Sequence, residues 1–452
     1  MDDIGIAVPA ATRTRRSPYP LLLAVLLIVL AFPFLLRKPA DWDDVFVPAA
    51  VRLRTGGDIY QHAFVFPPVN ALLALPFSHL PRLGSLLAWY AVSAFCFCVL
   101  LRGSWRLAGG HAFPRAGGVP RREHLIVAVG LVLGLPFALD CFGNRHTDLL
   151  IAALVITGCL SLRAGRGFVA AIWFGLAGGL KCTPLLWAPY LLLKRRFGAA
   201  AVVLIVAIGV NVLPDLLYPA ATGSRLTQWV NVFIAPMANG QRDPGVWGSA
   251  AINNHSLAGV AYRWLTLERT WDDGRTAAHS SSARVSPQSL RALVYGADAV
   301  LLLAAATVTL RSASRRRNPQ PMGATNPVPA EALEFALVCL LMLLLSPQSS
   351  KPHFCTMMLP GFCLAREAVR RRDVVLGLVL AAAGICTLLA NKDLWVVVVY
   401  ETALWYSTVF AAALLLFAGC LRARWHVGTS RNVAAAQVAG AIRPSQGLDA
   451  VA

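Results

Sequence analysis

The chain has 452 residues, of which 57% are apolar and only 14% carry a charge. Soluble domains carry about 25% charged residues, so an ordinary soluble fold is excluded, and so much apolar surface also excludes disorder. The formal charge is +19, from 41 basic and 22 acidic residues. Because the basic residues lie in short runs between apolar stretches, they indicate a membrane topology rather than a nucleic-acid partner.

Twelve apolar stretches predict membrane-crossing helices, since a helix needs about 20 apolar residues to cross the hydrocarbon core. Segment 183–193 is too short for a full span and predicts a broken or re-entrant helix, while 167–180 and 353–365 are also short. The expected fold is an all-α polytopic membrane protein, a bundle of about 10–12 transmembrane helices with extracytoplasmic loops. The twelve segments are 20–36, 84–101, 123–139, 147–162, 167–180, 183–193, 198–214, 289–310, 331–346, 353–365, 374–390 and 399–420.

Basic residues set the predicted orientation, because cytoplasmic loops carry an excess of Lys and Arg. With the N-terminus inside, the short inner segments hold 25 of the 41 basic residues, an alternation that requires twelve crossings. The protein is therefore expected to be a multi-pass protein of the cell membrane with both termini in the cytoplasm. The predicted organisation is a cytoplasmic segment at 1–19, a transmembrane domain at 20–421 with outer loops 37–83 and 215–288, and a disordered cytoplasmic tail at 422–452.

The polar residues gather at the predicted outer ends of the helices. A transporter would concentrate ionisable residues in mid-membrane, whereas these spans contain almost no charge, with Asp298 and Glu401 as exceptions. Six separate segments contribute to the outer group, which favours an active site built from loops on a helical scaffold. The group contains Asp41, Asp43, Asp44, Asp58, His62, Asn144, Arg145, His146, Lys181, Asn253, Asn254, His255, Lys351 and His353.

The first outer loop begins with the acidic cluster Asp41-Trp-Asp-Asp44, followed by a predicted short helix at 46–54 and a Gly-Gly break. The next stretch, 64–76, has an apolar face that suits a helix lying in the membrane interface. A carboxylate at this boundary can act as a general base if its pKa lies near the working pH. From physical principles alone, the favoured interpretation is that the acids cap and solvate the start of a helix.

Other outer turns carry groups that suit a phosphate or a sugar hydroxyl. Asn144, Arg145 and His146 share one turn, although a basic residue in an outer turn goes against the charge rule. Asp148, two residues beyond His146, could equally be the cap of the next helix. Lys181 lies at a broken helix end, where a lysine either neutralises an anionic headgroup or extends to the surface.

Lys351 and His353 lie in another short turn between spans. A single histidine is more often structural, but a lysine and a histidine together at a helix junction make a functional role as plausible as a structural one. The sequence contains no convincing G-x-x-x-x-G-K-[ST], G-x-G-x-x-G, H-E-x-x-H or G-x-S-x-G motif. No nucleotide-binding site is therefore predicted, and an activated donor would have to reach the protein through the membrane.

The order of these motifs resembles glycosyltransferase family 87, the polyprenyl-phosphate-mannose-dependent mannosyltransferase-like membrane proteins with the GT-C fold. The resemblance covers about residues 20–365, with departures at Lys351 and Pro352 from the family's Ser-Pro-x-Ser-Trp-x-His-His. It rests on Asp41-Trp42, Gly56-Gly57-Asp58-Ile59-Tyr60, Phe66-Pro67-Pro68, Gly143-Asn144-Arg145-His146, Ala177-Gly178-Gly179-Leu180-Lys181-Cys182-Thr183-Pro184, Ser346-Pro347 and His353.

The resemblance implies an inverting transfer of a sugar from a polyprenyl phosphate to a lipid or glycan acceptor at the outer face. One outer-loop acid would deprotonate the acceptor hydroxyl, with Asp41 the first choice, Asp43 the second, and Asp44 in the same cluster. The family's acid precedes an aromatic residue by about four positions, whereas Asp41 precedes Phe46 by five and Asp43 by three. Cationic groups would stabilise the departing lipid phosphate, so neither a metal nor another cofactor is expected.

The remaining expectations concern substrates and alternatives. The sugar is expected to be a mannose-like hexose or a pentose, and the partners are the bilayer, the donor and the acceptor. The alternative is a transporter or flippase for a lipid-linked glycan. A transferase of phosphoryl or acyl groups is disfavoured, because an acyltransferase should carry a histidine within a membrane-embedded helix. The expected phosphate contacts are Lys181, Arg145 and His353, and the other expected substrate-binding residues are Tyr60, Asn144, His146, His255 and Lys351.

Overall fold

The computed structural model describes residues 17–38, 40–61, 63–110, 121–220, 223–241, 252–272, 275–281, 285–313 and 328–441. These residues form helices and one two-stranded antiparallel sheet. Most of the predicted cytoplasmic segment 1–19, and residues 442–452 of the predicted tail, lie outside the described residues.

The first half of the chain contains long apolar helices, with several short helices between the first and the second long helix. In chain order it contains α1 (Tyr19–Leu36), the π-helix η1 (Trp42–Phe46), α2 (Val47–Arg54), α3 (Val69–Ala74), the 3-10 helix η2 (Leu75–His79), α4 (Arg82–Leu107), α5 (Arg121–Asn144), α6 (Asp148–Arg163), α7 (Gly167–Leu180), the 3-10 helix η3 (Thr183–Leu186), α8 (Trp187–Leu193) and α9 (Phe197–Leu217).

The second half adds a small projecting unit and completes the bundle. It contains α10 (Arg225–Trp229), the π-helix η4 (Val230–Ile234), α11 (Ala235–Ala238), α12 (Leu257–Thr266), β1 (Leu267–Asp272), β2 (Arg275–Ser280), α13 (Pro287–Ala313), α14 (Ala330–Leu344), the 3-10 helix η5 (Lys351–Met357), α15 (Met358–Arg371), α16 (Val374–Leu389), α17 (Val397–Trp405) and α18 (Thr408–Ala441).

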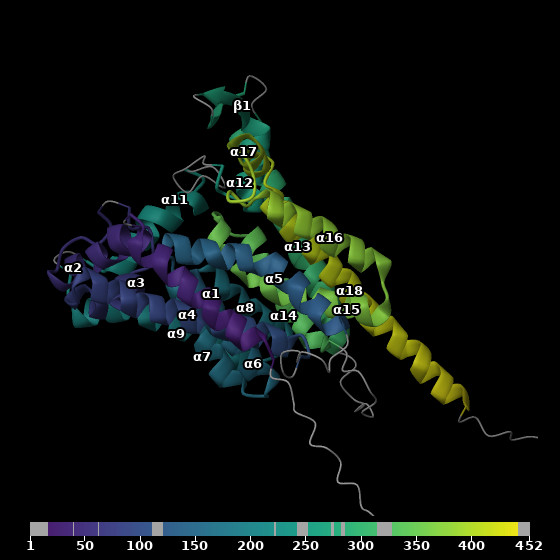
Figure 1. The fold of residues 1–452 in the computed structure, drawn as a ribbon. Coiled ribbons are helices and arrows are strands. Elements are labelled where there is room, and N and C mark those ends of the chain that lie inside the picture. Colours follow the sequence, from purple (N-terminus) through teal and green to yellow (C-terminus); the bar gives the residue numbers. More distant parts are fainter. Residues whose placement is uncertain are drawn as a thin grey trace, which may run out of the picture.

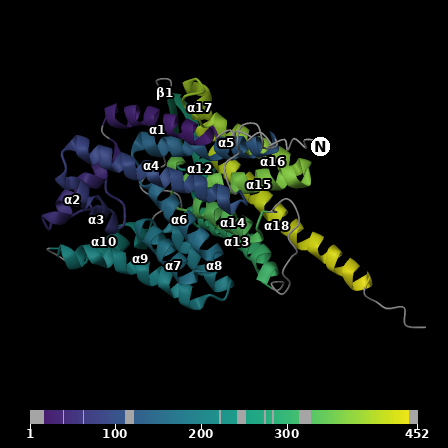
Figure 2. The ribbon, with the colours of Figure 1, turned by 60° about the horizontal axis from the view of Figure 1, so that its bottom comes forward.

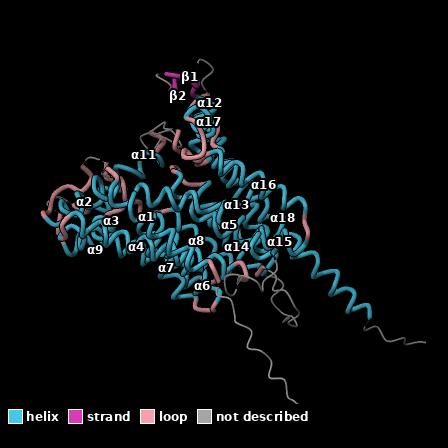
Figure 3. The backbone as a smooth tube through the Cα atoms, viewed as in Figure 1, coloured by secondary structure: helices cyan, strands magenta, loops and turns pink. Residues whose placement is uncertain are grey.

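The long helices pack into one bundle, and the unit formed by α12, α17 and the β1–β2 hairpin projects from one end of it (Figures 1 and 2). Helices make up most of the described trace, and strand is confined to that hairpin (Figure 3). Leu267 of β1 pairs with Ser280 of β2, and Asp272 pairs with Arg275. The all-α fold class expected from the apolar runs is therefore confirmed.

Six described helices are long and apolar enough to cross a membrane. Several remaining bundle helices are shorter, such as the 16-residue α6 and the 15-residue α14. At 1.5 Å per residue each covers only about 23 Å, less than the hydrocarbon core of about 30 Å. Because most of α14 is buried, its side chains contact other parts of the protein rather than lipid. The protein is a multi-pass membrane protein that combines helices long enough to cross a membrane with shorter helices, of which α14 is buried within the bundle.

Two predicted segments differ in their details from the observed helices. The expected broken helix at 183–193 is present as η3 followed by α8. The expected single span at 399–420 is instead divided into α17 and α18, because Ser407 adopts a left-handed backbone with φ +48°. In the predicted tail, α18 remains helical through Ala441, as suits an Ala-rich sequence of high helix propensity.

The two long loops that were predicted to face outside are joined to each other at one end of the bundle. Trp229 Nε1 donates to the carbonyl oxygen of Val65 at 3.0 Å, and Tyr60 Oη donates to that of Arg225 at 3.2 Å. These contacts tie the first loop to the segment after α9. They give the acidic cluster a fixed support at this end.

The opposite end of the bundle contains a buried charge that the span prediction overlooked. Glu334 of α14 is fully buried and lies 2.6 Å from Lys194 Nζ, 3.1 Å from Arg424 Nη2 and 3.0 Å from Tyr190 Oη. This network links α14 to α8, α18 and the turn after α8. Since a buried carboxylate needs such partners, Glu334 fixes how these helices pack.

Candidate functional site

The acidic loop is anchored by one aromatic side chain. Trp42 of η1 is 1% exposed and stacks on Trp89 of α4 with ring centroids 3.8 Å apart. Its indole N–H also donates to Ser85 Oγ at 3.2 Å. Asp44 is exposed, and the side chain of Asp41 remains 44% exposed. The anchor thus fixes the loop while it leaves the Asp41 carboxylate open.

The third acid, Asp43, faces inward and pairs with the fully buried Arg145. The Arg145 guanidinium also donates to the carbonyl oxygen of Phe34 at 2.9 Å from Nε, and to that of Arg37 at 3.1 Å from Nη2. Arg145 has a left-handed backbone with φ +53°, which a non-glycine residue adopts only when its surroundings enforce it. Arg145 therefore fastens the end of α1 to the acidic loop, and its donors face protein acceptors.

Asp148, the first residue of α6, lies at the centre of a cluster of charges. Lys181 Nζ is 2.8 Å from Asp148 Oδ1, and His353 Nε2 is 3.5 Å from Oδ2. His146 Nδ1 contacts the same Oδ2 atom. The helix N-terminus adds a favourable interaction with this nearly buried carboxylate. One carboxylate thus gathers three of the sequence motifs, from the α5–α6 turn, the end of α7 and η5.

His146 bridges two carboxylates, because its Nε2 lies 3.4 Å from Asp41 Oδ2 while its Nδ1 faces Asp148. Burial by itself lowers the pKa of His146, but the charges of Asp148 and then Asp41 outweigh it, so the pKa lies above its usual value. The rings of Phe46 and Phe66 approach the imidazole edge-on, with centroids 6.5 Å and 6.0 Å away. A protonated His146 can donate to both acids at once and so orient Asp41.

His146, Asp148 and His353 offer three ligand atoms within 4.8 Å of one another, close enough to surround one metal ion. Two features of the donor set oppose that use. The Lys181 ammonium already neutralises the carboxylate, and His353 Nδ1 accepts the backbone N–H of Ser350 at 3.1 Å. With Nδ1 as acceptor, the neutral ring carries its proton on Nε2, which then cannot coordinate an ion. The cluster fits a hydrogen-bonded charge network.

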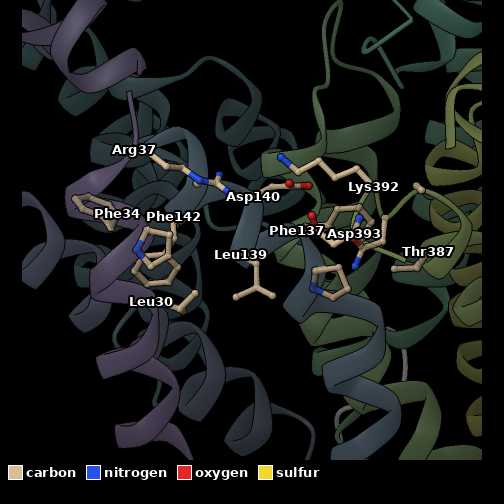
Figure 4. A pocket seen from close by; sticks show the side chains of 15 residues that line it. Leu30, Phe34, Arg37, Phe137, Leu139, Asp140, Phe142, Thr387, Lys392 and Asp393 are labelled. Carbon is tan, nitrogen blue, oxygen red and sulfur yellow. The ribbon is translucent and has the colours of Figure 1, made fainter. Parts of the chain in front are cut away.

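A pocket of about 160 Å³ lies beside this cluster, between α1, α5 and the turn that joins α16 to α17 (Figure 4). Arg37, Asp140 and Lys392 line one side of it, and apolar side chains such as Leu139 line the other (Figure 4). Lys351 Nζ lies 3.2 Å from Asp140 Oδ2. The pocket therefore combines an apolar floor with a charged rim.

The other predicted binding residues take supporting or peripheral positions. Tyr60 joins the outer loops through Arg225, as described above. His255 is fully buried with Nδ1 3.1 Å from Ser407 Oγ, and Asn144 is exposed at the end of α5. The predicted residues that the structure brings together are Asp41, His146, Lys181 and His353.

Sequence reasoning missed two carboxylates as site residues, Asp140 and Asp148. Asp148 was interpretable as an ordinary helix cap, and Asp140 lies just past the end of a predicted span. A signal was present, because cationic residues such as Lys181 and Lys351 at helix ends in a membrane protein need acidic partners when they are buried.

The comparisons with known proteins place this geometry in context. The family model described as glycosyltransferase family 87 matches residues 64–347. A polyprenol-phosphate-mannose-dependent alpha-(1-2)-phosphatidylinositol pentamannoside mannosyltransferase of Mycobacterium tuberculosis (strain CDC 1551 / Oshkosh) is 30% identical over 236 residues, 47% of this chain and 52% of that protein. The protein of the same description from Mycolicibacterium smegmatis (strain ATCC 700084 / mc(2)155) is 26% identical over 215 residues, 43% of this chain and 48% of that protein.

The chain thus spans about half the length of the curated relatives that it matches. Among solved structures, ArnT from Cupriavidus metallidurans, crystallised with undecaprenyl phosphate, overlays with a TM-score of 0.35 and 14% identity. The overlay covers 95% of this chain and 81% of ArnT. The acidic loop and His353 lie outside the segment that the family model matches.

Proposed function

The chain belongs to glycosyltransferase family 87, and from this premise we propose that it is a membrane glycosyltransferase. It takes a sugar from a polyprenyl-phosphate donor and transfers it, with inversion, to a lipid or glycan acceptor at the outer face. The observation that carries the proposal is the half-exposed carboxylate of Asp41, held by His146 at one end of a membrane bundle.

Asp41 is the best-placed general base of the three acids. Asp43 is paired with Arg145, and the side chain of Asp44 is exposed and forms no ion pair or hydrogen bond with the described residues that would orient it towards His146. The π-helix also accounts for the unusual spacing, since a π-turn holds one residue more than an α-turn. Asp41, five positions before Phe46, therefore corresponds to an acid four positions before the aromatic residue in a regular helix.

The proposed reaction is a single displacement at the sugar. Asp41 accepts the proton of the acceptor hydroxyl, whose oxygen attacks the anomeric carbon as the bond from that carbon to the phosphate oxygen breaks. The polyprenyl phosphate leaves with its own negative charge. His146 and Asp148 hold the base in one orientation, and Lys181 balances the negative charge of Asp148.

The nature of the substrates is supported by the relatives and by the membrane setting. Both curated relatives are described as acting with polyprenol-phosphate-mannose on a phosphatidylinositol mannoside. On this basis we infer a mannose-like hexose, or a pentose, as the transferred sugar and a glycolipid or glycan as the acceptor. The donor reaches the site through the membrane.

The test measures transfer of radiolabelled sugar in proteoliposomes. Purified polyprenyl-phosphate mannose, arabinose and glucose are each supplied to the wild type, Asp41→Asn and Asp44→Asn, with total membrane lipid and glycan as acceptors. Loss of a general base costs about 10²–10⁴-fold in rate, so we expect a loss of that size for Asp41→Asn. Asp44→Asn is the matched control and should retain near wild-type transfer.

Folding of each variant is checked by its thermal midpoint and by size-exclusion elution. Equal activity of the wild type and a well-folded Asp41→Asn would exclude Asp41 as the base. Movement of intact donor between leaflets without any transfer, in the wild type, would replace the proposal by the flippase alternative.

A further inference from the structure

The basic residues of the charge cluster are already paired, although a departing lipid phosphate needs cationic partners of its own. Lys181 lies 2.8 Å from Asp148, and the guanidinium of Arg145 faces Asp43 and two backbone carbonyl oxygens. Binding of a phosphate to Lys181 would leave Asp148 with only His146 and His353, and binding to Arg145 would leave Asp43 with only the exposed Arg82, so either exchange weakens a buried ion pair. A phosphate would bind more favourably to cations elsewhere near the site.

Such cations line the pocket between α1, α5 and the α16–α17 turn. Arg37 and Lys392 are exposed on its rim, and neither side chain forms an ion pair or hydrogen bond with the described part of the chain. Lys351 next to them is paired with Asp140 at 3.2 Å. Counting Asp393, which also lines the pocket, three cations face two carboxylates, so the rim carries a net charge of +1.

Below the rim, an apolar strip continues along α5 in the direction of the membrane. Leu139 lines the pocket, while Val132 and Leu125, two and four helical turns earlier on the same face, are 38% and 54% exposed. On the α16 side, a Cβ added to Gly384 would lie 3.7 Å from Val132, so the strip runs beside α16.

Two structural links connect this pocket to the charge cluster. Arg145 holds the backbone carbonyl oxygens of Phe34 and Arg37, both of which line the pocket. On the other side, η5 carries Lys351, paired with Asp140 of the pocket, and two residues later His353, which faces the cluster. A ligand on the rim therefore lies next to the elements that position Asp41.

We propose that this pocket binds the phosphate of a single-chain isoprenoid phosphate, with Arg37 and Lys392 as its cationic partners and the chain lying along α5 between α1 and α16. The choice of an isoprenoid chain rests on the proposed function. The phosphate site itself rests on two exposed cations that form no ion pair with the described residues, above an apolar floor. This assignment moves the phosphate contact away from Lys181, Arg145 and His353.

The test measures binding without turnover. The full-length protein in nanodiscs of neutral lipid is titrated with undecaprenyl phosphate, and bound ligand is counted by native mass spectrometry. Arg37→Gln/Lys392→Gln should raise the dissociation constant at least tenfold. Lys38→Gln, which removes an exposed cation next to Arg37, is the matched control and should change it less than twofold. Leu139→Trp, which fills the apolar floor, should weaken binding without any change of charge.

Competition separates the sources of the phosphate. Displacement of the ligand by inorganic phosphate, or equally well by dioleoyl phosphatidic acid, would overturn the single-chain assignment. Unchanged binding in the folded double variant would overturn the site. Because Asp41→Asn should bind undecaprenyl phosphate normally, lost transfer with intact binding affects only the proposed base. Binding lost in the double variant, in a protein that transfers no sugar, would support the site and contradict only the proposed function.

Discussion

Three ionisable side chains contact Asp148, and the role of each follows from its contacts rather than from its residue type. Lys181 neutralises the charge of the Asp148 carboxylate, and His146 also contacts Asp41 and so orients it. The backbone N–H of Ser350 fixes the ring of His353. A buried charge network of this kind persists only when each member keeps its partner. The effects of pH and of metal chelation follow from these contacts.

The charge on His146 makes the stability of the protein dependent on pH. Its pKa is raised in the folded state by Asp148 and Asp41, against the effect of burial. The stabilisation is therefore fully present below the unfolded pKa of about 6.5 and is lost as pH rises through the higher folded value. The free energy of unfolding should fall over this range by at most about 1.4 kcal/mol per pH unit for one proton, and the thermal midpoint in detergent should fall with it.

His146→Gln is the control for this pH dependence, because it removes the titrating group but keeps a side chain that can donate a hydrogen bond. The difference in thermal midpoint between the wild type and His146→Gln should shrink as pH rises. If the difference in thermal midpoint stays constant between about pH 6 and about pH 9, a range that extends above the reference histidine pKa, the charge on His146 does not contribute to stability.

Removal of divalent metal ions should leave activity unchanged, because His353 presents a protonated Nε2 and Lys181 occupies the carboxylate. The measurement compares sugar transfer before and after treatment with EDTA, and again after addition of excess Zn²⁺ or Mn²⁺. A loss that only one added ion restores would contradict the charge-network interpretation of His146, Asp148 and His353.

At the scale of elements, the bundle is fixed at its two ends by different means. At the end that contains Asp148, the stacked rings of Trp42 and Trp89 anchor η1, and Arg145 fastens the end of α1. At the other end Glu334 joins α14 to α8 and α18 through Lys194 and other buried partners. Because the two ends share no residues, damage to one need not alter the chemistry of the other.

Glu334→Gln should therefore destabilise the protein without an effect on the chemistry of each folded molecule. Removal of one member of a buried ion pair costs about 3–5 kcal/mol, since Lys194 and Arg424 are left uncompensated. Thermal unfolding in detergent measures the loss, and transfer per folded molecule should match the wild type. In Glu334→Gln/Lys194→Met part of the stability should return, and strictly additive losses would contradict a direct coupling.

At the scale of the whole molecule, alternating helix directions bring distant segments to one end. Asp148 and His353 are separated by more than 200 residues and still meet there. The projecting hairpin lies beyond that end (Figure 1). The orientation of this end towards the outside remains a prediction from the distribution of basic residues.

Cysteine labelling tests that orientation. In a Cys182→Ser background, which removes the exposed native cysteine, Ser280→Cys in the hairpin should react with a membrane-impermeant maleimide on intact cells. Ala164→Cys, in the exposed turn between α6 and α7, should react only after permeabilisation. The reverse pattern would invert the predicted topology.

The sequence by itself determined the helices and the region of the site. In a membrane every backbone polar group must be satisfied within the segment, so long apolar runs become helices. The excess of basic residues on alternate connections predicted which helix ends meet, and the resulting group contained Asp41, His146, Lys181 and His353. The split at Ser407 was not predicted, because an apolar run contains no sign of a single left-handed residue.

Only the tertiary structure decided which member of the acidic cluster faces the site. Asp41, Asp43 and Asp44 are equivalent by composition, and their directions follow from the stacking of Trp42 on Trp89 in another helix. The central role of Asp148 likewise depends on partners brought by α7 and η5. Helix formation is determined by neighbouring residues, whereas charge pairing depends on residues far apart in the chain that meet only after the helices have packed.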